Sequence, residues 1–97
     1  FSTVGAAVQM TLGGDGRIAQ LGIGLTAVGD APFAATVAED ALRGAQPGDE
    51  MFREAAAAAS RQSRPADDSH GPAEYKRAIV TEMTFRALRA AFGRALA

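Results

Sequence analysis

The chain contains no cysteine, a single histidine and no long apolar run, and each absence excludes a class of protein. Without thiols, these 97 residues form neither a disulfide framework nor an iron–sulfur or thiolate-zinc site, which is compatible with a reducing compartment. No stretch approaches the ~18 apolar residues that a membrane-spanning helix needs. The first residues, FSTVGAAVQM, carry no positive charge of the kind that opens a signal peptide, so we expect no such signal here.

Charge and length narrow the possibilities further. The formal net charge is -1, with 22% charged and 47% apolar residues, which is typical of a globular domain and not of a nucleic-acid-binding surface. A chain of this length forms at most one domain, which buries about 60–65% of the surface that its unfolded chain exposes. Because Phe1 stands in place of an initiator methionine and a strand pattern begins at once, we expect this single domain, residues 1–97, to be part of a longer chain.

A β-hairpin is predicted over about residues 3–28. Apolar residues alternate with small or polar ones over 4–12, and the alternation resumes over 17–28, which is the period of half-buried strands. The cluster Gly13–Gly16 between them can adopt the positive φ angles of a hairpin turn. The positions expected on the inner face are Val4, Ala6, Val8, Met10 and Leu12 in the first strand and Ala19, Leu21, Ile23 and Leu25 in the second.

The second strand has an outer face made of Gln20, Gly22, Gly24 and Thr26. Glycine has no side chain to pack, so this face is either bare to water or approached closely by another backbone. Two strands alone are marginally stable in water. We therefore expect helices on one face of the sheet, and a further strand or a neighbouring domain at its edge.

Two short helices are predicted after the hairpin, at about residues 34–43 and 50–62. Gly44 is the favoured left-handed stop for the first helix, and Asp49 can cap the second. The positions expected to face the core are Val37, Ala38, Ala41 and Leu42 in the first helix and Met51, Phe52, Ala55, Ala56 and Ala59 in the second.

The longest predicted helix covers about residues 72–96. Pro72 suits its first position, where a missing N–H costs nothing, and Glu82 and Arg86 are spaced to form an ion pair. Its apolar positions form two overlapping stripes, Tyr75, Ile79, Met83 and Ala87, and Phe85, Leu88, Phe92 and Leu96. The predicted fold class is α+β, a small antiparallel sheet of a hairpin and a possible further strand packed against three α-helices.

Two glycine-containing segments have a possible binding chemistry. The segment Gly22–Ala27 fits the loose pattern G-x-G-x-x-A of dinucleotide-binding turns, whose glycines let a pyrophosphate approach a helix N-terminus. However, these glycines lie within a strand pattern and no helix follows, which favours strand glycines. Gly13–Gly16 could hold an anion, but a hairpin turn is the commoner use of this composition.

Asp67, Asp68 and His70 are the only grouping with the ligand types of a metal or acid–base site. Because all three lie on one predicted loop with no fourth ligand elsewhere, capping of the following helix is the favoured role. Tyr75 is interpreted as a core aromatic and not as a catalytic acid. No serine has a convincing base. We predict no catalytic and no metal-binding residue in the chain.

Several segments match the patterns of a known family, and together they cover nearly the whole chain. Pro65–Ala78, PADDSHGPAEYKRA, is similar to P-x-x-D-x-R-G-x-x-x-Y-[RK] at the start of that family's last helix, and Arg86–Leu88 to the R-A-L that follows. Ala38–Gly44 resembles an A-E-x-x-L-x-G helix, Leu25–Val28 the end of a second strand, and Phe1–Val4 the tail of the first strand. The chain thus resembles the C-terminal domain of the FAD-binding medium subunit of molybdenum hydroxylases, which include aerobic carbon monoxide dehydrogenase and xanthine dehydrogenase.

The resemblance implies the accessory domain of a larger, cytoplasmic flavoprotein subunit. In that family two preceding domains, absent from this chain, hold most of the FAD, while this domain closes over the flavin ring. The implied partners are the iron–sulfur small subunit and the molybdopterin large subunit, and electrons run from molybdenum through iron–sulfur clusters to FAD. Ala34 and His70 stand where the family usually has arginines, so contacts through those arginines are not implied here.

The cofactor-binding residues implied by the resemblance are Phe1 and Thr3. Alternation along a strand places both on one face, and the family's first strand lies beside the isoalloxazine ring. The alternative is that Phe1 is a frayed terminus and Thr3 an ordinary strand residue. For the chain as a whole, the alternative function is a free-standing, non-enzymatic interaction module that forms a homo-oligomer through a strand edge.

Overall fold

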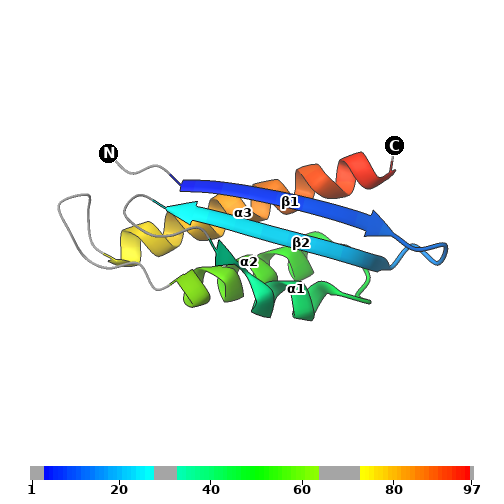
Figure 1. The fold of residues 1–97 in the computed structure, drawn as a ribbon, viewed down its shortest axis with the longest axis horizontal. Coiled ribbons are helices and arrows are strands. Elements are labelled where there is room, and N and C mark those ends of the chain that lie inside the picture. Colours follow the sequence, from blue (N-terminus) through cyan, green and yellow to red (C-terminus); the bar gives the residue numbers. More distant parts are fainter. Residues whose placement is uncertain (1–3, 28–32, 64–72, 97) are drawn as a thin grey trace.

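In the computed structural model, residues 4–27, 33–63 and 73–96 are described. These parts form a three-stranded antiparallel sheet in the order β1-β2-β3 and three helices that cover one side of it (Figure 1). The elements are β1 (Val4–Leu12), β2 (Ile18–Ala27), β3 (Phe33–Ala34), α1 (Thr36–Leu42), α2 (Asp49–Ser63) and α3 (Ala73–Leu96). The α+β class with a small antiparallel sheet and three helices is therefore confirmed.

The further strand that the sequence left open is β3, which pairs with β2 through Gly24 and Leu25. The first helix was expected from Ala34, and this was wrong, because Ala34 belongs to β3 and α1 begins at Thr36. The third strand is too short to show a period in the sequence, so its residues were assigned to the next pattern along the chain.

The hairpin turn has the predicted place, and β2 begins after it with a bulge. The Gly16 N–H donates to the carbonyl of Gly13 at 3.0 Å, and Gly16 has a φ of 83°. A register shift follows, so that Leu12 pairs with Ile18. Ile18 is buried with 1% exposure, whereas Ala19, expected on the inner face, is exposed. A bulge carries one unpaired residue, which moves the side chains before it to the opposite face.

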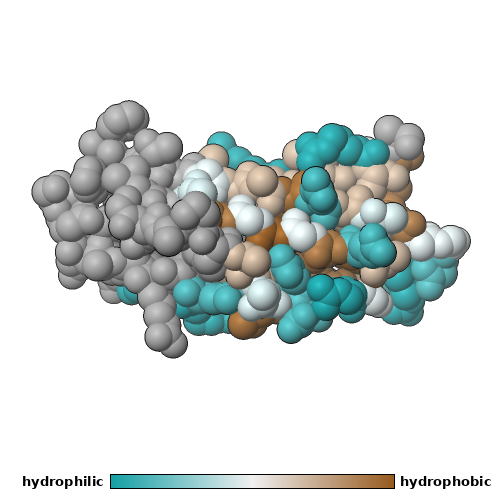
Figure 2. Space-filling view, in the orientation of Figure 1, coloured by the Kyte–Doolittle hydropathy of each residue, from teal (hydrophilic) through white to brown (hydrophobic). Residues whose placement is uncertain are grey.

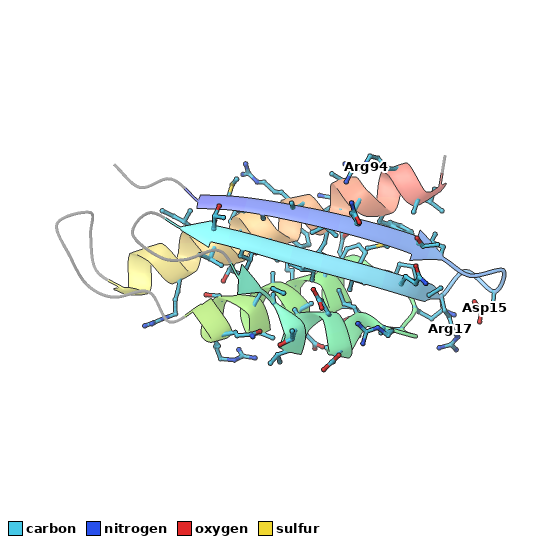
Figure 3. The ribbon with its side chains drawn as sticks, in the orientation of Figure 1. Asp15, Arg17 and Arg94 are labelled. Atoms are coloured by element: carbon cyan, nitrogen blue, oxygen red, sulfur yellow. The ribbon has the colours of Figure 1, made fainter. Side chains whose placement is uncertain are left out.

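The start of β2 is tied to the end of α1. Gly44 has a φ of 82°, which confirms it as the left-handed stop of the helix. Its N–H donates to the carbonyl of Ile18 at 2.7 Å, and the N–H of Ile18 donates to the carbonyl of Ala45 at 3.0 Å. Arg17 Nη1 adds a bond to the Gly44 carbonyl at 3.2 Å, next to the Asp15 and Arg17 side chains labelled in Figure 3.

The core lies between the inner face of the sheet and the helices. α3 packs along β1 and α2, while α1 packs against β2 and α2. In α2, Phe52 and three alanines are buried as predicted, whereas Met51 is only half-buried and Asp49, expected as the cap, is the first residue of the helix. The largest fully buried side chains are Phe52, Ile18, Ile23, Leu42, Leu88, Val80 and Thr84.

The buried face of α3 differs from the predicted stripes. Leu88 and Phe85 are buried as predicted, but Met83 is 37% and Leu96 65% exposed. Val80, Thr84 and Ala91 are buried instead. With Leu88 they form one stripe at helical spacing on a helix that packs against both α2 and β1, and the buried Thr84 shows that hydrophobicity alone does not define the inner face. The side chain of Tyr75 lies outside the described part of the chain.

The inner face of α1 is narrower than predicted. Ala38 and Leu42 are buried, whereas Val37 is 55% exposed and Ala41 is exposed. A helix of 7 residues presents a single i, i+4 stripe to its neighbours, and here that stripe is Ala38 and Leu42. Within the described ranges no helix combines the length and apolarity that crossing a bilayer requires.

Candidate functional site

The β1–β2 ribbon leaves one face without helices, and this outer face is the candidate site. Alternation along the two strands places opposed pairs of small or polar residues on it. All but Gly5 are exposed, and Gly5 is half-buried. The pairs are Gly5 with Thr26, Ala7 with Gly24, Gln9 with Gly22, and Thr11 with Gln20.

A shallow open groove of about 1440 Å³ runs along these strands. It extends to Glu39 of α1 at one border and to a group of small residues and Arg94 of α3 at the other. The lining residues of α3 are Ala87, Ala90, Ala91, Arg94 and Ala95. In Figure 2 the middle of this view shows pale and brown atoms, with teal hydrophilic side chains around them. The groove thus offers a largely uncharged floor with charged groups at its border.

One cation and one anion border the groove, and each binds the backbone of a strand. Arg94 Nη2 donates to the carbonyl of Val8 in β1 at 3.2 Å, and Figure 3 shows Arg94 on α3 beside that strand. On the β2 side, the backbone N–H of Ile23 donates to Glu39 Oε2 at 2.8 Å. Both contacts satisfy backbone groups that would otherwise lie unpaired at a sheet edge.

The helix that carries Glu39 is held in place by α2. The N–H of Val37 donates to Gln62 Oε1 at 3.2 Å, and Gln62 Nε2 donates to the hydroxyl of Thr36 at 3.1 Å. α2 also packs against α3, and there Phe52 and Phe92 form an edge-to-face pair with ring centroids 5.8 Å apart. The two borders of the groove are therefore positioned by the same helical layer.

The chemistry of the outer face is that of a binding surface. Its side chains are methyl, amide and hydroxyl groups, with no nucleophile and base in contact. The described ranges contain no group of three or more His, Cys, Asp or Glu residues that could hold a metal ion. The described residues that line the groove can donate and accept hydrogen bonds.

The glycine segments have the structural roles that their context favoured. Gly22–Ala27 lies within β2, so Gly22 and Gly24 are strand glycines and not the phosphate-binding turn of a dinucleotide site. Gly13–Gly16 forms the hairpin turn.

Several residues singled out in the sequence lie outside the described ranges. They are the expected cofactor-binding residues Phe1 and Thr3, and the loop residues Asp67, Asp68 and His70. Conversely, sequence reasoning missed Glu39 and Arg94 as groups that border the site. Glu39 is the glutamate of the A-E-x-x-L-x-G pattern, which gave no contact for it, and Arg94 had only the pattern of an ordinary solvated residue beside a helix's apolar stripe.

Comparison with known proteins assigns the chain to a family. Residues 1–91 match the family model for the CO dehydrogenase flavoprotein C-terminal domain. The chain belongs to this family. The resemblance seen in the sequence is confirmed, and the outer face can be considered as a surface of a flavoprotein C-terminal domain.

A curated relative and solved structures agree with this assignment. The flavoprotein C-terminal domain is 36% identical over 95 residues to the carbon monoxide dehydrogenase medium chain of Afipia carboxidovorans, covering 98% of this chain and 33% of that protein. It superposes on quinoline 2-oxidoreductase from Pseudomonas putida 86 with a TM-score of 0.88 and 28% identity, covering 97% of this chain and 33% of that one. For carbon monoxide dehydrogenase from Hydrogenophaga pseudoflava the TM-score is 0.84 and the identity 40%, covering 94% and 31%. The domain therefore spans about a third of the length of these relatives.

Proposed function

We propose that this chain is the C-terminal accessory domain of the FAD-binding subunit of a molybdenum-containing oxidoreductase of the carbon monoxide dehydrogenase type. The match of residues 1–91 to the flavoprotein C-terminal domain carries this proposal. Residues 1–97 are then a single domain at the end of a longer polypeptide, which agrees with their coverage of 33% of the curated relative.

The proposed role is to close over a flavin that other domains hold. The segment Gly22–Ala27 is not the phosphate-binding turn of a dinucleotide site, because Gly22 and Gly24 lie inside β2. FAD supplies the redox chemistry when bound, and we assign its binding mainly to the preceding part of the subunit. This chain's own contribution is a rigid sheet, backed by three helices, that limits the access of water to the ring.

The wider setting of the proposal is a cytoplasmic complex with two other subunits. In it the domain contacts an iron–sulfur small subunit and a molybdopterin large subunit while electrons pass from molybdenum through iron–sulfur clusters to FAD. The relatives named as carbon monoxide dehydrogenase support this setting.

The alternative is a free-standing module that dimerises through a strand edge. Along β2, β3 pairs with Gly24 and Leu25, and Glu39 accepts a bond from the N–H of Ile23. On the outer edge of β1, Arg94 donates to the carbonyl of Val8. We prefer the accessory-domain proposal because residues 1–91 match the flavoprotein C-terminal domain.

The proposal is tested by comparing the longer subunit with a version that ends before Phe1. We expect the intact subunit to bind FAD and the truncated subunit to leave the flavin more accessible to solvent, measured as stronger quenching of flavin fluorescence by iodide. Circular dichroism and thermal unfolding show whether the truncated subunit still folds. Adding residues 1–97 back as a separate chain provides a second measurement. Equal FAD content and equal quenching in both versions would contradict a role at the flavin.

A further inference from the structure

Within the described parts of the chain, no contact or backbone conformation requires a glycine at Gly22 or Gly24. Both lie in β2, the middle strand of the sheet, where glycine costs stability because it packs nothing and loses much backbone freedom on folding. Neither has a positive φ, and a Cβ added to either would meet no atom within 4 Å. A larger residue would fit both positions in the domain by itself.

A third glycine on the same face behaves differently. A Cβ at Gly5 would lie 2.7 Å from the hydroxyl oxygen of Thr26, so a larger residue there would force the Thr26 side chain to shift. Nor does a bulge explain Gly22 and Gly24, since they pair regularly with Gln9 and Ala7 and the register shift lies between Thr11 and Leu12. Among the usual reasons for a strand glycine, close approach by another chain or ligand remains.

We propose that the outer face around Gly22 and Gly24 is the surface against which the preceding part of the same subunit packs. This inference rests on the proposed function, because it requires the longer flavoprotein subunit. The family is a C-terminal domain, and 33% coverage of the curated relative leaves about two thirds of such a protein in front of this domain.

The geometry of the first strand favours the same polypeptide as the occupant. β1 begins at Val4, opposite Ala27, and Gly5 pairs with Thr26 at that end of the outer face. A polypeptide that continues before β1 therefore leads away from this end of the outer face, where β1 begins in Figure 1. Because the connection is intramolecular, the effective concentration of the preceding domains at this face is high, and modest contacts are enough to hold them.

The groove also defines the kind of protein surface that fits. With Gly22 and Gly24 opposite Gln9 and Ala7, a partner backbone can approach the sheet more closely than large side chains allow. Amide and hydroxyl groups of Gln9 and Thr26 offer hydrogen bonds at the rim. Since Glu39 and Arg94 lie at opposite borders, we expect a flat partner surface with a basic group toward Glu39 and an acidic group toward Arg94.

The absence of cysteine from the chain permits a site-specific test. Thr26→Cys places one thiol of similar volume on the outer face, and Ala41→Cys places one on the exposed side of α1, outside the groove. Maleimide labelling rates of both variants are compared in the 97-residue chain and in the longer subunit, with peptide mass spectrometry separating these sites from any cysteine of the preceding part. We expect the longer subunit to slow labelling at position 26 by about tenfold or more, because a docked thiol reacts only when the interface opens. Labelling at position 41 stays unchanged.

A second pair of variants tests whether the glycines themselves permit docking. Gly24→Val is added to the Thr26→Cys subunit, and Gln20→Val is the control. Gln20 lies on the same strand and face as Gly24 but outside the groove, and its side chain is already larger than that of valine. We expect Gly24→Val to restore fast labelling at position 26 and Gln20→Val to leave it slow. In the 97-residue chain, neither change should alter the rate, because a Cβ at position 24 meets nothing within 4 Å.

The outcomes distinguish docking of the preceding part of the same subunit from binding of FAD, of another subunit or of a second copy of the chain. Slow labelling in the longer subunit alone, with or without FAD, supports the inference. The inference is overturned if protection of position 26 requires bound FAD or occurs only in the complex with other subunits. It is also overturned if the 97-residue chain at high concentration already shows this protection, or if position 26 labels at the same rate in all samples. A subunit that binds FAD normally but leaves position 26 open refutes the docking surface only. Failure of the proposed function is seen separately, as unchanged flavin content and quenching after truncation before Phe1.

Discussion

The carboxylate of Glu39 completes the edge of the middle strand by accepting a hydrogen bond from the backbone N–H of Ile23 at 2.8 Å. The carbonyl of Ile23 accepts a bond from the N–H of Ala35 at 2.9 Å, so both backbone groups of this residue have partners just beyond the end of β3. A side chain of α1 thus supplies one residue of β2 with the hydrogen-bond partner that a longer β3 would supply to several. The bond couples the position of α1 to the sheet.

We expect Glu39→Ala to destabilise the chain by about 1–3 kcal/mol, because it leaves a part-buried N–H of β2 without its acceptor. Glu39→Gln retains an acceptor oxygen and serves as the matched control, with a loss of less than about 1 kcal/mol. Urea unfolding followed by circular dichroism measures both. Equal losses for alanine and glutamine would show that the charge, and not the hydrogen bond to Ile23, stabilises this edge.

Leu88 tests whether α3 is a core element. It is fully buried, so Leu88→Ala should cost about 2–5 kcal/mol through lost burial and a residual cavity. Leu96→Ala is the matched control on the same helix, where 65% exposure predicts a change within about 0.5 kcal/mol. Both follow from denaturant titrations. A loss below about 0.5 kcal/mol at position 88 would place α3 at the periphery of the fold.

Thr84 has a buried hydroxyl with no hydrogen-bond partner among the residues that the structure describes. Thr84→Val keeps the shape of the side chain and removes the buried polar group, so we expect a gain of about 1–2 kcal/mol in the free energy of unfolding. The control is Thr81→Val on the same helix, where the hydroxyl donates to the carbonyl of Arg77 at 2.9 Å. There we expect a loss of about 0.5–1.5 kcal/mol. A loss at position 84 comparable to that at position 81 would contradict the unsatisfied state of Thr84.

The 97-residue chain should bind FAD weakly or not at all, because we assign most of the FAD contacts to the preceding part of the subunit and the segment Gly22–Ala27 is a strand, not a phosphate-binding turn. Isothermal titration calorimetry of the chain with FAD measures this directly, and the longer subunit, stripped of flavin, is the positive control. Stoichiometric, tight binding to the isolated chain would move the main cofactor site into this domain.

Phe1 and Thr3 stay predicted flavin contacts, since they lie outside the described ranges. In the longer subunit we expect Phe1→Ala to increase solvent access to the ring and Thr3→Ala to shift the flavin reduction potential through a lost hydrogen bond. Thr11→Ala is the control, because Thr11 lies at the hairpin end of β1 and outside the groove. Unchanged absorption spectra, potentials and FAD affinities in both variants would assign the domain a purely structural role.

Periodicity along the sequence was enough to predict the hairpin, its turn and the helical layer. The alternation in β1 and β2, the positive-φ glycines at positions 16 and 44, and the alanine-rich face of α2 are local properties of the chain, and the structure retains each of them. Local sequence also contained the unusual outer face, because two glycines in a strand pattern are visible without coordinates. These patterns do not show which element packs against each face.

Tertiary structure decided the remaining features. The bulge at the start of β2, opposite Leu12, reverses the side chains that precede it in β2, so Ile18 and not Ala19 is buried. In α3, which packs against α2 and β1, Val80 and Thr84 are buried while Met83 is 37% exposed. The borders of the candidate site depend on residues far apart in sequence, since Arg94 reaches Val8, and Glu39 reaches Ile23. A periodic pattern specifies which side of an element is apolar, but only packing specifies which neighbour that side meets and which backbone groups still need a partner.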